Sequence, residues 1–186
     1  MKPLILITGG ARSGKSSLAE KKAKELGENI VYIATAIAFD EGMKDRIKKH
    51  RLDRPENWAT IERYKDFICI IEDEAFKKGD LILLDCMTLM VTNLMLESNL
   101  DFDHCPMEDV HKLENHIFKE VDALLKIISD NNKTAIIVTN EVGMGLVPSY
   151  RMGSIFRDIA GRVNQYIASK AKEVYLTVSG IEIKIK

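Results

Sequence analysis

The sequence predicts an α/β fold, in which a mainly parallel sheet is covered by helices on both faces. Three observations support this prediction. Short apolar segments, typical of buried strands, alternate with helical segments along the whole chain. The strand segments are almost continuously apolar, which is typical of parallel strands covered on both sides. The segments on either side of Ser179-Gly180 instead alternate apolar and polar residues, which predicts a C-terminal antiparallel hairpin strand.

The spacing of the apolar residues predicts each element in turn. We expect strands at residues 4–8, 30–34, 58–62, 81–85, 135–139, 173–179 and 181–186. We expect helices at residues 15–26, about 40–50, 65–77, from after Asp85 to Leu96, 110–128 and 155–167. Gly79 supplies a stop for the third helix. Residues 98–106 and the glycine-containing segment 140–148 are expected to be loops.

Residues 9–16 have the spacing of a phosphate-binding P-loop between the first strand and the first helix. The motif consists of Gly9, Gly10, Ala11, Arg12, Ser13, Gly14, Lys15 and Ser16. Its backbone N–H groups and the helix N-terminus would surround the phosphates of a nucleotide. Lys15 would reach the β- and γ-phosphates, and the Ser16 hydroxyl would hold Mg²⁺. The motif predicts a P-loop NTPase (RecA-like) domain, and the flanking strand and helix disfavour the alternative of a chance glycine-rich turn.

Composition limits the class of protein further. The chain has 186 residues, 46% hydrophobic and 30% charged, with a net charge of −1, so we expect one P-loop nucleotide-binding catalytic domain spanning residues 1–186. The near-neutral charge argues against nucleic-acid partners, and no apolar run has the length of a membrane span. The absence of a secretory leader and the three scattered cysteines favour a reducing, cytoplasmic location. Cys69 and Cys86 are expected to be small core residues.

Several polar segments should meet at one edge of the sheet, because parallel α/β sheets bind ligands beyond the carboxyl ends of their strands. This rule places residues 9–16, 34–37, 85–88 and 140–145 together. Asp85 ends an apolar strand, which is the usual place of the carboxylate that shares Mg²⁺ with a P-loop hydroxyl. A solvated acid at a strand end is the alternative.

Residues 48–54 surround His50 with cations. Arg46 lies four residues before His50 and therefore shares its helix face. Neighbouring cations disfavour the imidazolium, and a neutral imidazole can attack phosphorus. The charge pattern alone favours the alternative, a solvated basic helix with an incidental histidine. The remaining histidines, His104, His111 and His116, fit no metal-binding spacing and are expected at the surface.

The P-loop and several further blocks of sequence together carry a specific resemblance. They are Thr8–Ser16, Tyr32–Thr35, the stretch from Met43 through His50-Arg51 and Arg54-Pro55 to Glu62, Thr88–Asn93, Val138–Gly145 with Val147-Pro148, Phe156–Gln165, and the tail from Val178 to Lys186. Together they cover nearly the whole chain. In these blocks the chain resembles the bifunctional adenosylcobinamide kinase / adenosylcobinamide-phosphate guanylyltransferase family of cobalamin biosynthesis.

The resemblance implies two reactions. A nucleoside triphosphate, ATP or GTP, would phosphorylate the aminopropanol hydroxyl of adenosylcobinamide. GMP from GTP would then pass to that phosphate through a guanylyl-histidine at His50, giving adenosylcobinamide-GDP and pyrophosphate. The implied homotrimer and the choice of kinase donor do not follow from the sequence patterns. Corrinoid contacts are unassigned, and the loop at residues 140–148 fits either that role or a purely structural one.

The resemblance also implies site residues. Guanine-nucleotide contacts map onto residues 9–16, Thr35, Ala36, Ile37, Arg51, Leu52, Asp53, Arg54, Glu62 and Asp85, with Mg²⁺ at Ser16 and Asp85. Some relatives carry Glu where this chain has Asp85, and the shorter side chain would shift the metal or admit a water. Some relatives also have a histidine before the nucleophile, where this chain has Lys49.

Overall fold

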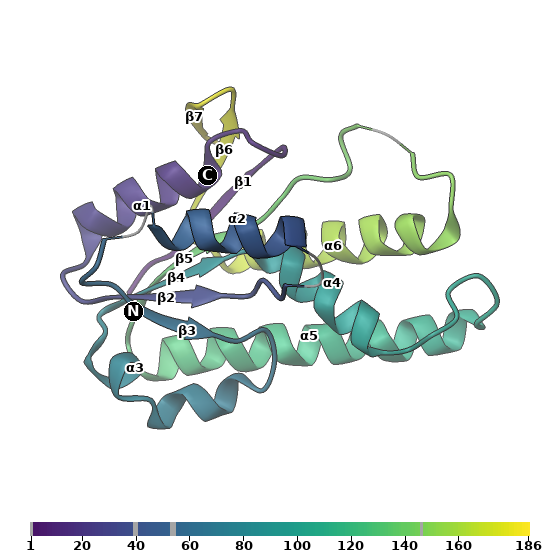
Figure 1. The fold of residues 1–186 in the computed structure, drawn as a ribbon, viewed down its shortest axis with the longest axis horizontal. Coiled ribbons are helices and arrows are strands. Elements are labelled where there is room, and N and C mark those ends of the chain that lie inside the picture. The colour runs from purple at the N-terminus through teal and green to yellow at the C-terminus, as the bar shows by residue number, and fades with distance from the viewer. Residues whose placement is uncertain (1, 39–40, 53–54, 146) are drawn as a thin grey trace.

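A computed structural model describes residues 2–38, 41–52, 55–145 and 147–186 (Figure 1). For Met43, Arg46, Ile47, Lys49, His50 and Leu52 the description is of the backbone alone. The elements in chain order are β1 (Leu4–Gly9), α1 (Lys15–Leu26), β2 (Ile30–Ala34), α2 (Glu41–Leu52), β3 (Ala59–Glu62), the 3₁₀ helix η1 (Phe67–Glu72), α3 (Glu74–Lys78), β4 (Leu81–Asp85), α4 (Met87–Glu97), α5 (Met107–Asp130), β5 (Thr134–Val138), α6 (Arg151–Lys170), β6 (Glu173–Val178) and β7 (Ile181–Lys184).

The strands form one seven-stranded sheet in the order β3-β2-β4-β5-β1-β6-β7. Every pairing is parallel except that of β6 with β7, which is antiparallel. The predicted mainly parallel sheet with a C-terminal antiparallel strand is therefore confirmed.

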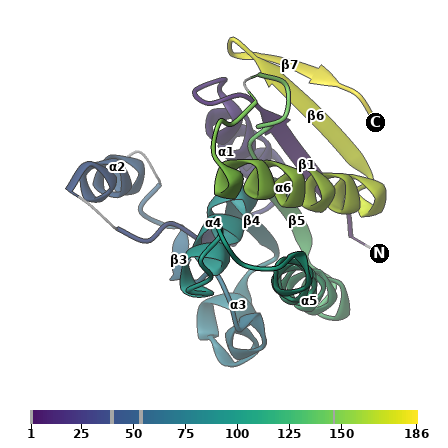
Figure 2. The same ribbon diagram turned by 90° about the vertical axis from the view of Figure 1, so that its right-hand side faces the viewer.

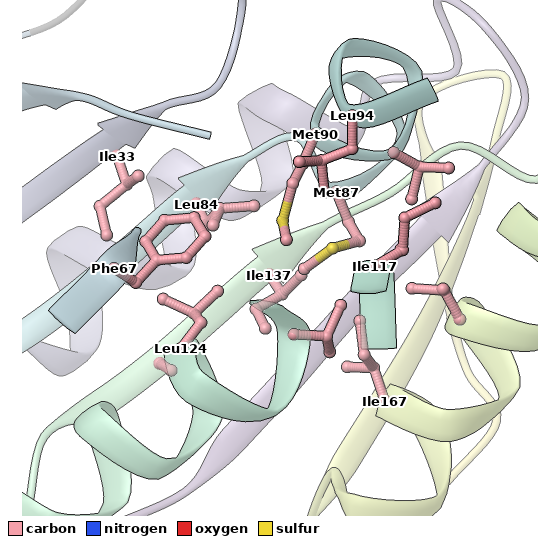
Figure 3. Packing of buried hydrophobic residues seen from close by; sticks show 14 of the residues in the cluster. Ile33, Phe67, Leu84, Met87, Met90, Leu94, Ile117, Leu124, Ile137 and Ile167 are labelled. Atoms are coloured by element: carbon pink, nitrogen blue, oxygen red, sulfur yellow. The ribbon is translucent and has the colours of Figure 1, made fainter. Parts of the chain in front are cut away.

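Helices cover both faces of the sheet, with α4, α5 and α6 on one face and α1 on the other (Figure 2). Neighbouring residues of β4 show the consequence: Leu84 packs with the core of the first face and Leu83 with that of the second, and both are fully buried. Figure 3 shows the larger core, where Met87 and Met90 of α4 lie close to Ile137 of β5. Burial on both faces explains why the strands are continuously apolar.

The strand register brings the carboxyl ends together. Ala34 of β2 lies opposite Asp85 of β4, and Asp85 lies opposite Val138 of β5. Val138 in turn pairs with Ile7, two residues before the P-loop. The segments that follow β1, β2, β4 and β5 therefore leave the same edge of the sheet, as predicted.

The prediction of one helix over residues 65–77 is wrong. Asp73 is extended (φ −71°, ψ 128°), and its carboxylate accepts hydrogen bonds from the N–H groups of Ala75 (2.8 Å) and Phe76 (3.3 Å). It therefore caps a new helix, α3, and separates it from η1.

The geometry of η1 also corrects the expectation for Cys69. A 3₁₀ helix has three residues per turn, so Phe67 and Ile70 share the buried face while Ile68 and Cys69 are exposed. The expectation for Cys86 is confirmed, because its side chain is buried.

Helix α2 extends two residues past its expected end, to Leu52. Figure 2 shows it beyond the edge of the sheet that β3 forms, apart from the packed layers. Among the described residues, no helix has both the length and the apolar character needed to cross a bilayer.

Candidate functional site

The P-loop connects β1 to α1 at the carboxyl edge of the sheet (Figure 1). Gly14 adopts a left-handed conformation (φ 98°) directly before α1, which turns the chain into the helix. The Lys15 side chain is 7% exposed, and its Nζ donates a hydrogen bond to the carbonyl oxygen of Gly10 (2.5 Å). The loop thus presents a helix N-terminus and one ammonium group, which is an arrangement suited to phosphate.

Strand β6 and the turn that follows it contact the P-loop. Ser13 Oγ and Thr177 Oγ1 are 2.8 Å apart in a buried hydrogen bond, and the Gly180 N–H donates to the Ser13 carbonyl (2.9 Å). At Gly9 (φ 155°), a Cβ would lie 2.4 Å from the Thr177 carbonyl oxygen. The sequence pattern did not identify Thr177 or Gly180 as site residues, because it carries no signal of this contact.

Ser16 and Asp85 lie in direct contact. Ser16 Oγ donates a hydrogen bond to Asp85 Oδ2 (2.8 Å), and the Tyr32 hydroxyl donates to the same oxygen (3.0 Å). A hydroxyl and a carboxylate are hard oxygen ligands of the kind Mg²⁺ prefers, so these residues fit the metal. The described residues include no group of three or more His, Cys, Asp or Glu that could bind a metal alone. Phosphate oxygens and waters would complete the coordination.

Thr35, which directly follows β2, is 1% exposed. Its side chain forms hydrogen bonds with Cys86, which directly follows β4. Its Oγ1 donates to the Cys86 carbonyl (2.7 Å) and accepts from the Cys86 N–H (2.9 Å). Asn93 Nδ2 donates to the Thr35 carbonyl (2.6 Å). The Thr35 hydroxyl is therefore used within the protein, and any contact with a nucleotide falls to its backbone or to the residues after it.

A cavity of about 580 Å³ lies beyond the ends of β2 and β3. Ala36 and Ile37 line it, as do the predicted site residues Arg51 of α2 and Glu62 of β3, which form an ion pair with each other. Cations predominate in the part of its lining that the structure describes, where Lys44, Lys48, Arg51 and Arg63 accompany one acid, Glu62. The cavity suits an anion with a planar or apolar part. Lys44, Arg63 and Tyr64 are lining residues that the sequence interpretation missed.

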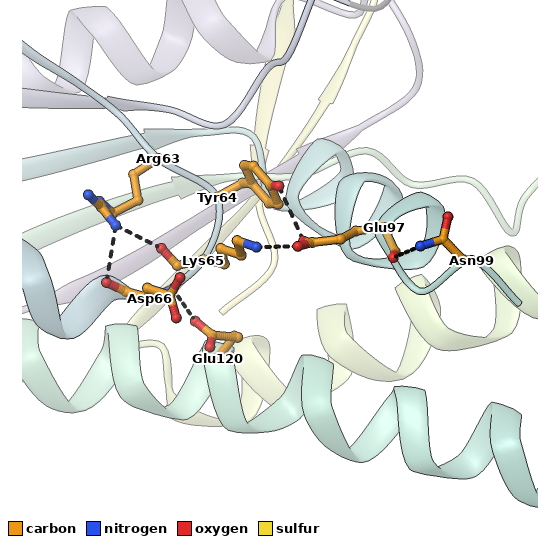
Figure 4. A network of polar contacts seen from close by, with 7 residues as sticks. All are labelled: Arg63, Tyr64, Lys65, Asp66, Glu97, Asn99 and Glu120. Carbon is orange, nitrogen blue, oxygen red and sulfur yellow. Dashed lines mark hydrogen bonds and ion pairs between the residues drawn. The ribbon is translucent and has the colours of Figure 1, made fainter.

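The segment after β3 is held against α4 and α5 (Figure 4). The Tyr64 hydroxyl donates to Glu97 (3.2 Å), Lys65 forms an ion pair with Glu97, and the Asp66 N–H donates to Glu120 (2.8 Å). The hydrogen bond from Lys65 lowers the pKa of Glu97, whereas burial and the nearby Glu97 charge raise the pKa of Tyr64. These contacts fix the wall of the cavity that Arg63 and Tyr64 provide.

The remaining predicted residues are placed only in part. The backbone of His50 lies in the last turn of α2, between Lys48 and Arg51, which both line the cavity. The side chains of His50 and Leu52 lie outside the description, as do Asp53 and Arg54 entirely. The other three histidines are exposed, as expected, and His104 pairs with Asp101 (2.8 Å).

Comparison with known proteins decides the family. A sequence model described as "Cobinamide kinase / cobinamide phosphate guanyltransferase" matches residues 5–185. The chain belongs to this family. Its members are enzymes, and the bifunctional adenosylcobalamin biosynthesis protein CobU of Escherichia coli (strain K12) is 45% identical over 98% of this chain and 99% of its own.

Two further similarities differ in strength. The protein of the same name from Salmonella typhimurium (strain LT2) is 43% identical, again over 98% of this chain and 99% of its own. The crystal structure of the flagellar accessory protein FlaH from Methanocaldococcus jannaschii matches with a TM-score of 0.45 and 18% identity, over 99% of this chain and 78% of that one. The structural match to FlaH is too weak to bear on function. Membership of the cobinamide kinase / cobinamide phosphate guanyltransferase family rests on the sequence matches.

Proposed function

We propose that this chain phosphorylates the hydroxyl of adenosylcobinamide with ATP or GTP and then transfers GMP from GTP to the new phosphate. The products would be adenosylcobinamide-GDP and pyrophosphate. One observation carries the proposal: a P-loop with a contacting Ser16–Asp85 pair occurs in the same chain as a cation-lined cavity beside the helix that bears His50. The family description and the relatives' names support the same pair of activities.

In the kinase step, the P-loop would hold the triphosphate by its backbone N–H groups, from Gly9 to Ser16. Lys15 would neutralise the negative charge that develops on the transferred phosphoryl group. A bound Mg²⁺, held by Ser16 and Asp85, would supply further charge neutralisation. Catalysis would then consist mainly of positioning and electrostatics.

In the transfer step, the neutral imidazole of His50 would attack the α-phosphorus of GTP. An N–P bond would form, the bond from the α-phosphorus to its bridging oxygen would break, and pyrophosphate would leave. An oxygen of the corrinoid phosphate would next attack the same phosphorus and release His50. Lys48 and Arg51, on the same helix, would stabilise the phosphate charge. The other contacts with the nucleotide would come from Thr35, Ala36, Ile37, Leu52, Asp53, Arg54 and Glu62.

Radiolabelled GTP tests this proposal. GTP labelled at the α-phosphate is expected to transfer label to the protein in an acid-labile, base-stable form. His50→Ala should abolish the label and spare much of the kinase activity, whereas His111→Ala, at an exposed position on α5, should label normally. Label that survives in His50→Ala would exclude His50 as the nucleophile. No label at all alongside kinase activity would indicate a kinase alone.

We also propose that the chain assembles as a homotrimer. Three isoleucines at the β7 edge of the sheet are exposed in the single chain: Ile181 (68%), Ile183 (46%) and Ile185 (59%). Because an exposed apolar patch often marks a contact with another protein, this edge supports contact with another subunit. Light scattering after gel filtration should then give three times the 21.0 kDa chain mass, and a monomer mass at working concentration would contradict the proposal.

A further inference from the structure

A second cavity adjoins the P-loop on the side away from α2, and nothing so far assigns it a role. Its volume is about 350 Å³, and its lining includes Gly10, Arg12 and Ser13 of the P-loop, Glu141 and Met144 after β5, and Val178 of β6. We propose that this cavity receives the phosphoryl acceptor of the kinase step, and that Glu141 is the base that takes the proton of the acceptor hydroxyl. The inference rests on the proposed kinase activity and adds a site and a catalytic residue to it.

The topology of the sheet brings Glu141 to the P-loop. Strand β5 lies between β1, which leads into the P-loop, and β4, which ends at Asp85. The Thr139 N–H donates to the Ile7 carbonyl (2.9 Å), and the Glu141 N–H donates to the Gly9 carbonyl (2.9 Å). Glu141 is therefore fixed by its backbone to the first residue of the P-loop.

A buried polar network supports this position from the other side. Thr88 Oγ1 accepts a hydrogen bond from the Asn140 N–H (2.6 Å) and contacts Thr139 Oγ1 (3.1 Å). The Thr139 hydroxyl donates to Asn164 Oδ1 (2.7 Å), and Asn164 Nδ2 returns a hydrogen bond to the Asn140 carbonyl (3.0 Å). A catalytic base needs such support, because a small displacement of a reacting group lowers the rate severely.

The carboxylate of Glu141 retains accepting capacity. Its Oε1 accepts a hydrogen bond from the Gly143 N–H (3.0 Å), and within the described part of the chain no partner is found for Oε2. The residue is half-buried and borders the cavity together with Gly10, whose carbonyl accepts from Lys15 Nζ. The structure thus places one carboxylate beside the end of the P-loop where Lys15 would meet the β- and γ-phosphates.

The loop that follows Glu141 offers an apolar surface for a large acceptor. Met144 and Val147 are each 79% exposed and Tyr150 is 63% exposed, which is unusual for three large apolar side chains in one short segment. A corrinoid presents a broad macrocycle whose periphery carries methyl groups between its amide side chains, and its hydroxyl lies at the end of one side arm. The loop would contact the macrocycle while the arm reaches the cavity.

The proposed step is a phosphoryl transfer from the nucleotide to the acceptor hydroxyl. The acceptor oxygen bonds to the γ-phosphorus as the bond from that phosphorus to its bridging oxygen breaks. The electron pair leaves with the nucleoside diphosphate, and the hydroxyl proton moves to Glu141 Oε2.

The test separates the two activities of the chain. In Glu141→Gln, phosphorylation of adenosylcobinamide by ATP is expected to fall by about 10²–10⁴-fold, the usual contribution of a general base. GMP transfer to adenosylcobinamide phosphate that is supplied ready-made should continue at the wild-type rate. Glu25→Gln, an exposed position on α1, is the matched control and should change neither reaction.

The pH profile distinguishes a base from a structural group. Wild-type kcat for the kinase step should rise through an acidic limb that Glu141→Gln lacks, and Glu141→Asp should keep that limb at reduced turnover. Full kinase turnover in Glu141→Gln, or an equal loss of both activities, would overturn the assignment of the base. If the wild-type chain phosphorylated no adenosylcobinamide, the proposed function itself would fail.

A second variant tests the acceptor surface. Replacing Met144 and Val147 with serine should raise KM for adenosylcobinamide and leave both KM for ATP and the folding stability unchanged, because both side chains are exposed. An unchanged KM for adenosylcobinamide would overturn the placement of the acceptor.

Discussion

Ser16 and Asp85 lie 69 positions apart in the sequence, yet their side chains form a 2.8 Å hydrogen bond at the carboxyl edge of the sheet. Ser16 lies in the first turn of α1, which follows β1, and Asp85 ends β4. These two strands are not neighbours, since β5 lies between them. The contact is therefore a product of the crossover topology. It leaves a hydroxyl and a carboxylate together where a nucleotide's metal would bind.

The Mg²⁺ dependence of the kinase step should report on this pair. Asp85→Asn keeps the size of the side chain and removes its charge, so the Mg²⁺ concentration for half-maximal rate should rise by at least about tenfold, since even the loss of a group that only supports a metal ligand costs about 10–100-fold in metal affinity. Tyr32→Phe removes the hydroxyl that donates to Asp85 Oδ2 (3.0 Å) and should cause a smaller shift in the same direction. A titration of kinase rate with Mg²⁺ measures both, and an unchanged dependence in Asp85→Asn would remove that residue from the metal site.

Gly9 and Gly10 should differ in their tolerance of alanine. At Gly9 a Cβ would lie 2.4 Å from the Thr177 carbonyl oxygen, at a φ of 155°, so Gly9→Ala should lower the free energy of unfolding by about 1–3 kcal/mol. At Gly10 the described residues, apart from its own chain neighbours, place no atom within 4 Å of the new Cβ, so Gly10→Ala should unfold at the wild-type urea concentration. Equal urea midpoints for both variants would show that β6 does not constrain the P-loop.

Cations on α2 should contribute to nucleotide affinity. Lys48 lines the 580 Å³ cavity. Lys48→Ala removes a charge-assisted contact with phosphate, so it should weaken GTP binding by about tenfold, or about 1.4 kcal/mol. The loss should shrink at high salt, which screens exposed charges. Calorimetric titration at two salt concentrations measures this, with Lys24→Ala in the last turn of α1 as the control. Equal GTP affinities for the two variants would mean that the nucleotide does not reach this cavity.

Local signals explain how much of the site could be predicted. The glycine spacing of residues 9–16, the adjoining strand and helix, and Asp85 at a strand end are all readable along the chain. The rule for parallel sheets then brings them to one edge without knowledge of the strand order. Thr177 and Gly180 could not be found in this way, because they contact Ser13 across 164 or more positions of sequence.

The error over residues 65–77 has a local cause as well. Phe67, Ile70 and Ile71 are apolar at three- and four-residue spacing, which fits an α-helix as well as a 3₁₀ helix. Asp73 decided between them, because its carboxylate caps the N–H groups of α3 instead of continuing one helix.

The pKa of Glu97 offers a test of the network that holds the cavity wall (Figure 4). The hydrogen bond from Lys65 lowers this pKa, so the carboxylate should titrate below the ordinary glutamate range. A depressed pKa means that the stabilisation is complete above the ordinary pKa and is lost as the pH falls through the folded value. Carbon-detected NMR titration should show this midpoint, and Lys65→Met should move it upward. Tyr64→Phe, which removes a weaker hydrogen bond (3.2 Å), should move it less. An unchanged midpoint in Lys65→Met would mean that the ion pair does not persist in solution, and that other contacts hold Arg63 and Tyr64 in place.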